Sequence, residues 1–152
     1  MNKSRKLKLQ SNYTPYPIND EDDEVYRNGI FQINITKIIE QIRSGKLLPE
    51  KEQIHVQDWF KTHFHGSINE DHLPSVDVTK TIIQAEISPD MYTIMGGNHR
   101  VEKAYREGTP YIDSFKLRVE QILPYFKETR GYETFVGYWN SKVDDKELGT
   151  NS

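Results

Sequence analysis

The sequence has no cysteine among its 152 residues, so disulfides, thiolate metal sites and a cysteine nucleophile are excluded. It has no apolar run long enough to span a bilayer, and no apolar stretch follows its basic first ten residues as in a secretory signal. We therefore expect a cytoplasmic protein that does not contact membranes. Positive charge is not in excess either, because the net charge is −3, which argues against DNA as a partner bound through bulk charge.

The pattern of apolar residues predicts a small α+β domain over residues 25–142. Short β-branched runs predict a strand at 30–35, a hairpin at 81–95 and a strand at 111–117. Helical spacing predicts helices at 37–44 and 98–107, each followed by a glycine. The polar residues 143–152 predict a flexible tail.

Residues 1–24 predict a flexible arm. A basic start is followed by two prolines and then by an acidic run at 20–24. Like charges at this density repel and favour a solvated chain. Two interpretations stay open: a lead that is dispensable for folding, or an acidic strip that docks on a basic protein partner.

Residues 46–78 form a long insertion that holds four of the five histidines. Trp59, Phe60 and Phe64 predict a small apolar patch that points inward. His63 and His65 have the spacing of two metal ligands on one face of a strand, but on a helix they would point in different directions. We therefore expect no metal site, and the alternative is a site formed by His63, His65 and a nearby aspartate.

The most informative segment is the turn at 96–100, Gly96, Gly97, Asn98, His99 and Arg100, which joins a predicted strand to a predicted helix. Two glycines allow a sharp turn and close approach of the backbone to a ligand, and Asn98 is a candidate helix cap. The first amides of a helix have no internal acceptor and favour an anion, and Arg100 offers a fork of donors suited to phosphate. The alternative is a plain turn with a packed histidine and a solvent-facing arginine.

Helix 98–107 also carries Lys103 and Arg106, which form a basic stripe with Arg100. The stripe fits either intrahelical pairing with Glu102 and Glu107 or a groove for nucleic acid, and we favour pairing.

The Gly-Gly-Asn-His-Arg turn, with its flanking strand and helix, resembles the phosphate-binding turn of the ParB/sulfiredoxin-like superfamily. The order of elements over residues 28–120 is also similar. The resemblance implies a ParB/sulfiredoxin-like fold, in which a mixed sheet has helices packed around it. It also implies a nucleotide, with magnesium, whose phosphates contact Gly96, Gly97, Asn98, His99 and Arg100. Asn98 stands where sulfiredoxin has its cysteine, so reductase activity of that kind is excluded, and too few residues follow for a helix–turn–helix module.

Three functions follow as alternatives. The first is a nucleotide-binding domain with ATPase, CTPase or phosphotransferase activity. The second is a non-catalytic protein-binding partner, such as an immunity or anti-defence protein, on the same scaffold. The third is a nuclease-like domain that acts on DNA. An enzyme would need a carboxylate as base or metal ligand, and the spacing selects none of the six candidates, which are Glu40, Glu50, Glu52, Asp58, Asp71 and Asp77.

Overall fold

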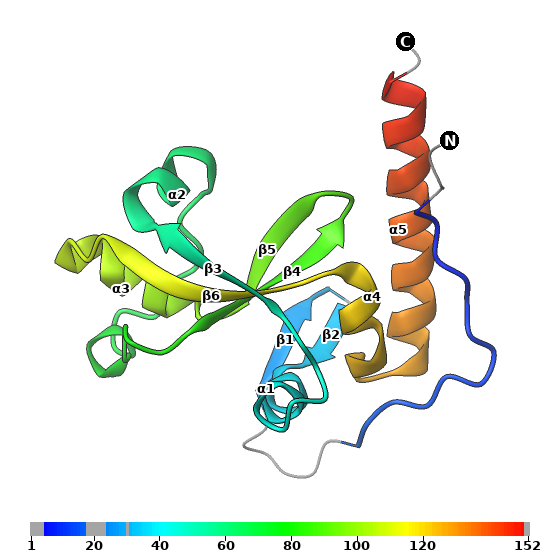
Figure 1. The fold of residues 1–152 in the computed structure, drawn as a ribbon, viewed down its shortest axis with the longest axis horizontal. Coiled ribbons are helices and arrows are strands. Elements are labelled where there is room, and N and C mark those ends of the chain that lie inside the picture. Colours follow the sequence, from blue (N-terminus) through cyan, green and yellow to red (C-terminus); the bar gives the residue numbers. More distant parts are fainter. Residues whose placement is uncertain (1–4, 18–23, 30, 151–152) are drawn as a thin grey trace. The chain divides into compact units, whose positions relative to one another are not determined.

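The computed structural model describes residues 5–17, 24–29 and 31–150 (Figure 1). Within these residues the chain forms five α-helices, a mixed four-stranded sheet and a separate two-stranded hairpin, which confirms the predicted small α+β class. The chain divides into two compact units. The first unit is built from the described residues of 1–48, 86–92 and 118–152, and the second from residues 49–85 and 93–117. No helix in this described part combines the length and the apolar character needed to cross a bilayer.

The first unit begins with a hairpin that leads directly into a helix. Strands β1 (Val25–Asn28) and β2 (Phe31–Asn34) pair antiparallel. Helix α1 (Ile35–Arg43) follows without a connecting loop, because the Asn34 side chain caps it by accepting the Lys37 amide hydrogen at 3.0 Å.

The rest of the first unit is helical. Helix α4 (Val119–Ile122) and the 3-10 turn η2 (Leu123–Tyr125) lead into the long helix α5 (Thr129–Thr150). The apolar residues of α5 recur at helical spacing, so they form one stripe that the unit buries. The buried members of this stripe are Tyr132, Phe135, Val136, Trp139 and Val143.

Helix α5 covers most of the predicted flexible tail at 143–152. Val143 belongs to the buried stripe, and Asp144 pairs with Lys6 at 2.7 Å. Lys146 also pairs with Asp90. The polar composition of the tail therefore reflects a solvated helix face, while residues 151 and 152 lie outside the described residues.

Residues 5–17, in the predicted arm, follow an extended path held against α5, although most of their side chains remain exposed. The side chains of Trp139 and Asn140 hydrogen-bond the main chain of Arg5 and Leu7. The hydrophobic pattern could not predict this placement, because it rests on polar contacts with the main chain. The rest of the predicted arm, apart from Glu24, lies outside the described residues, including the acidic residues 20–23.

The second unit is built on the four-stranded sheet, with strand order β3-β6-β4-β5. These strands are β3 (Glu50–His55), β4 (Ile82–Ser88), β5 (Met91–Gly96) and β6 (Tyr111–Leu117). β6 pairs antiparallel with β3 and parallel with β4, so the sheet is mixed. The middle of the β4–β5 hairpin, residues 86–92, belongs to the first unit.

Helix α3 (Asn98–Glu107) covers one face of this sheet. Its Val101 and Ala104 pack with sheet residues in a buried cluster. The other members of the cluster are Ile54, Val56, Ile82 and Ile112. Trp59 and Phe60 of α2 (Val56–Thr62) pack against the cluster, so this part of the second unit has one continuous core.

The predicted insertion at 46–78 supplies regular structure as well as loop. Strand β3, helix α2 and the 3-10 turn η1 (Leu73–Ser75) all lie within it. Two of the three aromatic residues expected to point inward do so, but Phe64 is 99 % exposed, because it follows the end of α2 and lies in a loop. That expectation was therefore wrong for Phe64.

Candidate functional site

The turn between β5 and α3 depends on a glycine at position 97. Gly97 has φ = +110°, a left-handed conformation that side chains disfavour. A Cβ added there would lie 2.5 Å from Cγ2 of Ile82, so the backbone also approaches β4 too closely for any larger residue. The predicted need for glycine at this position agrees with the geometry, and the Val101 amide closes the first turn of α3 by donating to Gly97 O at 3.2 Å.

The first turn of α3 has no acidic residue. The amide groups of Asn98, His99 and Arg100 precede the first intrahelical bond, so helix geometry leaves them without an internal acceptor. The partial positive charge of a helix N-terminus is therefore not balanced by a carboxylate within this turn. Such an end favours an anion.

Asn98 has a different role from the predicted cap. Gly97 occupies the cap position, no side-chain cap bond forms, and Asn98 is the first helical residue. Its side-chain amide lies against the backbone of Gly66, where an added Cβ would be 2.3 Å from Nδ2. Asn98 therefore joins the turn to the loop that follows α2.

His99 also contacts this loop. Its Nε2 accepts a hydrogen bond from the backbone amide of Asn69 at 3.1 Å, which fixes the tautomer in a neutral imidazole with the proton on Nδ1. The His99 ring also lies nearly perpendicular to the His72 ring, with ring centroids 5.1 Å apart. The ring is half-buried between helix and loop.

Arg100 is held by the segment that leads into β4. Its Nη1 donates to the backbone oxygen of Thr81 at 3.0 Å. This bond takes one of the five hydrogens that a guanidinium can donate. Asp77 is close enough for the Arg100 charge to matter: hydrogen bonds from Thr79 lower the pKa of Asp77, and the Lys80 and Arg100 charges lower it further.

The remaining basic residues of α3 have partners in the same loop. Lys103 donates to the backbone oxygens of Pro74 and Val76 at 2.9 and 2.8 Å. Arg106 pairs with Glu70 at 2.7 Å and with Glu102 at 3.2 Å. The favoured pairing with Glu102 is thus present, and the hydrogen bond from Arg106 lowers the pKa of Glu70. Arg106 is thus paired with carboxylates, whereas Arg100 and Lys103 donate to backbone oxygens, so each basic side chain of the stripe has a partner within the second unit.

The two histidines that flank Phe64 stack on aromatic rings of α2. His63 stacks on Trp59 at 3.6 Å, and His65 stacks on Phe60 at 3.9 Å. His65 also contacts a carboxylate oxygen of Glu102 at 2.5 Å. Among the described residues, no three histidine or carboxylate side chains are grouped so that they could hold a metal ion.

No family model, curated protein or solved structure matches this chain. The resemblance to the ParB/sulfiredoxin-like superfamily therefore rests on the turn and the order of elements alone.

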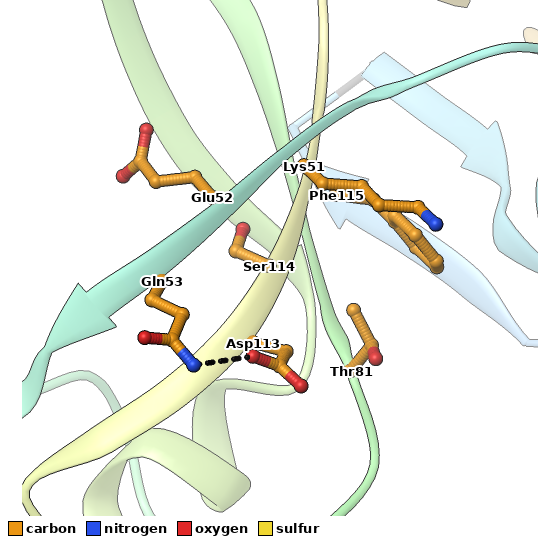
Figure 2. A pocket seen from close by; sticks show the side chains of 7 residues that line it. All are labelled: Lys51, Glu52, Gln53, Thr81, Asp113, Ser114 and Phe115. Carbon is orange, nitrogen blue, oxygen red and sulfur yellow. Dashed lines mark hydrogen bonds between the residues drawn. The ribbon is translucent and has the colours of Figure 1, made fainter.

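Sequence patterns did not reveal a cavity of about 330 Å³ on the sheet of the second unit (Figure 2). Gln53 donates to Asp113 across the strands at 3.3 Å, and the cavity also includes Thr81, whose oxygen holds Arg100. The continuous polar run at the start of β3, residues 50–53, was the only local trace of it, and the pairing of β3 with β6 was needed to locate the cavity. Its lining residues are Lys51, Glu52, Gln53, Thr81, Asp113, Ser114 and Phe115.

Proposed function

We propose that this protein binds a nucleotide through its phosphate groups at the N-terminus of α3. The observation that carries the proposal is the turn itself. Gly97, which is required by its left-handed φ and by the close approach of Ile82, precedes a ten-residue helix whose first turn holds His99 and Arg100 and no acid. This is the combination of amides, dipole and cationic fork that favours a phosphate.

Gly97, Arg100 and His99 have distinct parts in this proposal. Gly97 supplies the left-handed backbone conformation from which α3 begins, and the first amides of α3 bind the phosphate. Arg100, anchored by one donor on Thr81, presents its remaining donors to phosphate oxygens. His99, whose Nε2 is occupied by Asn69, offers the hydrogen on Nδ1.

Magnesium would accompany the nucleotide, because this ion is commonly held by phosphates, waters and one or two carboxylates. Of the six candidate carboxylates, Asp77 lies in the same segment before β4 as Thr81, whose backbone oxygen holds Arg100. Asp77 would then be the magnesium ligand. Its lowered pKa makes it a poor general base, so no catalytic base is assigned.

Labelled ATP and CTP, each with magnesium, provide the test. We expect the wild type to retain label on a filter and Arg100→Ala to bind at least tenfold more weakly. Arg106→Ala is the matched control, because Arg106 lies on the same helix and pairs with Glu70. It should bind like the wild type.

Equal binding by the wild type and Arg100→Ala would place the site elsewhere, and no binding by the wild type would refute the proposal. Chromatography of the same incubations separates the enzymatic alternatives, since released phosphate indicates an ATPase or CTPase and intact nucleotide indicates a binding protein.

One observation favours a second candidate function, that of a non-catalytic protein-binding partner. Phe64 is 99 % exposed between two histidines that are stacked on other rings. Large aromatic side chains at exposed positions are typical anchors of protein interfaces. Phe64→Ala should leave the melting temperature unchanged if the ring serves a partner, whereas a fall of more than about 3 °C, roughly 1 kcal/mol, would show that it packs within the fold.

A further inference from the structure

In the first unit, side chains of α5 recognise an extended stretch of main chain. The Asn140 amide accepts from Leu7 N at 2.7 Å and donates to Leu7 O at 3.1 Å. Trp139 Nε1 donates to Arg5 O at 2.8 Å, and the Tyr132 hydroxyl accepts from Gln10 N at 2.9 Å. These contacts are made with backbone atoms at three positions between residues 5 and 10, so they would suit any peptide with the same extended path.

Two side chains of the segment are recognised specifically. The first is Arg5, which forms two parallel bonds with the Glu86 carboxylate at 2.7 and 2.8 Å. Asp90 and Glu120 lie 3.6 and 3.8 Å from the same guanidinium, and its carbon lies 5.2 Å from the centre of the Trp139 ring. Three carboxylates and an aromatic face select a planar cation.

The second recognised side chain is Tyr13. Its ring stacks on Tyr132 with centroids 3.9 Å apart. Its hydroxyl donates to Leu123 O at 2.7 Å and accepts from Phe126 N at 3.1 Å. Burial raises the pKa of Tyr13 to about 12, so the hydroxyl stays a donor at any physiological pH.

The two sides of this contact differ in burial. Glu86, Tyr132 and Trp139 are at most 2 % exposed, whereas none of residues 5–17 is buried. The receiving residues are buried with the segment in place, and the segment lies on top of them. A segment with few buried apolar contacts opens more readily than the core beneath it. When it leaves, Glu86 keeps the amides of Asp90 and Val119 but loses the cation that Arg5 supplies.

We propose that this surface is a peptide-binding site of the first unit, for a partner protein's extended segment with an arginine and, eight residues later, a tyrosine. In the structure the chain's own residues 5–17 fill the site, so they compete with the partner. The partner's arginine restores the cation at the buried carboxylate, and its tyrosine occupies the place of Tyr13. The cluster of carboxylates is the feature that selects a basic segment.

The test uses the full chain with Arg5→Ala and Tyr13→Ala together, which weakens the internal segment and leaves the receiving surface intact. A fluorescent synthetic peptide of residues 5–17 is the probe, and anisotropy measures its binding. We expect saturable 1:1 binding to the double variant and at least tenfold weaker binding to the wild type, whose own segment competes. A peptide with Arg5→Ala should bind at least tenfold more weakly, and Asn140→Ala on the receiving side should also weaken binding.

Circular dichroism must show that each variant is folded. If the double variant is unfolded, the single variant Arg5→Ala takes its place in the binding experiment. A folded variant that binds no peptide overturns the proposal, as does equal affinity for the two peptides. Sedimentation of the wild type tests whether a second copy of this chain occupies the site instead of a partner protein. We expect a monomer, and a dimer that Arg5→Ala abolishes would mean that a second copy, not a partner protein, fills the site.

Discussion

Removing Arg5 should destabilise the protein by an amount that depends on pH. Glu86 is 2 % exposed, and its carboxylate accepts two bonds from Arg5 and one each from the amides of Asp90 and Val119. Hydrogen bonds to charged groups contribute about 1.5–3 kcal/mol each when one partner is lost. The Arg5 side chain is 29 % exposed, so solvent screens part of this term, and two amides remain. We therefore expect Arg5→Ala to cost about 2 kcal/mol at pH 7, or roughly 4–8 °C in melting temperature.

The pH dependence follows from the pKa of Glu86. Burial raises this pKa, but the hydrogen bonds from Arg5, Asp90 and Val119 outweigh burial and hold it below its ordinary value of 4.5. The stability that the charged form contributes is present above pH 4.5 and is lost as the pH falls through the lowered pKa. Without Arg5 the pKa of Glu86 rises. Protonation then removes the uncompensated charge of Glu86 in the variant, so the loss of unfolding free energy caused by Arg5→Ala becomes smaller in acid.

Urea unfolding at pH 7 and at about pH 4 measures both effects. Lys6→Ala is the control, because the Lys6–Asp144 pair joins the same segment to α5 on the exposed surface and should matter little at either pH. A cost for Arg5→Ala below about 0.5 kcal/mol at pH 7, or a cost that is the same at both pH values, would refute the reasoning. Because deletion of residues 1–17 removes the same contacts, the structure leads us to expect that the arm supports stability rather than being dispensable.

Three further outcomes can be checked by unfolding experiments. Gly97→Ala should cost about 2–5 kcal/mol, since it adds left-handed strain to a clash with Ile82, whereas Gly108→Ala at the other end of α3 should cost only about 1–2 kcal/mol, because no atom lies within 4 Å of the added Cβ. Equal costs would contradict the close approach of Gly97 to β4. Ser114→Ala should cost about 1–3 kcal/mol by removing the partner of the buried Gln84 amide, which bonds to it at 2.8 Å, and a neutral result would mean that the amide finds another acceptor. Chelation with EDTA should not change the melting temperature, and a loss that zinc restores would indicate a metal site in the histidine-rich insertion.

Local patterns predicted much of the fold. The predicted strand at 111–117 coincides with β6, and the predicted helix at 98–107 coincides with α3. The hairpin at 81–95 appears as β4 and β5. These elements have strong signals, because apolar and β-branched residues recur in the strands and glycine follows the helix.

Long-range contacts account for what could not be predicted. Strand β3 reads as a polar segment, and it becomes a strand because β6 provides its hydrogen-bond partners. The extended course of residues 5–17 depends on single polar side chains more than 100 positions away, such as Asn140. The turn at 96–100 was located correctly, but its contacts with Gly66, Asn69 and Thr81 were not visible in the sequence.

The most direct measurement of the central claim is a thermal shift series for the wild type and Arg100→Ala against ATP, ADP, CTP and GTP with magnesium. A ligand that binds only the folded state stabilises it by about 2.7 kcal/mol at roughly 100 times its dissociation constant. We predict that at least one nucleotide raises the melting temperature of the wild type by this mechanism and that Arg100→Ala loses most of the rise. If none of the four nucleotides shifts the wild type, phosphate binding at the N-terminus of α3 is contradicted.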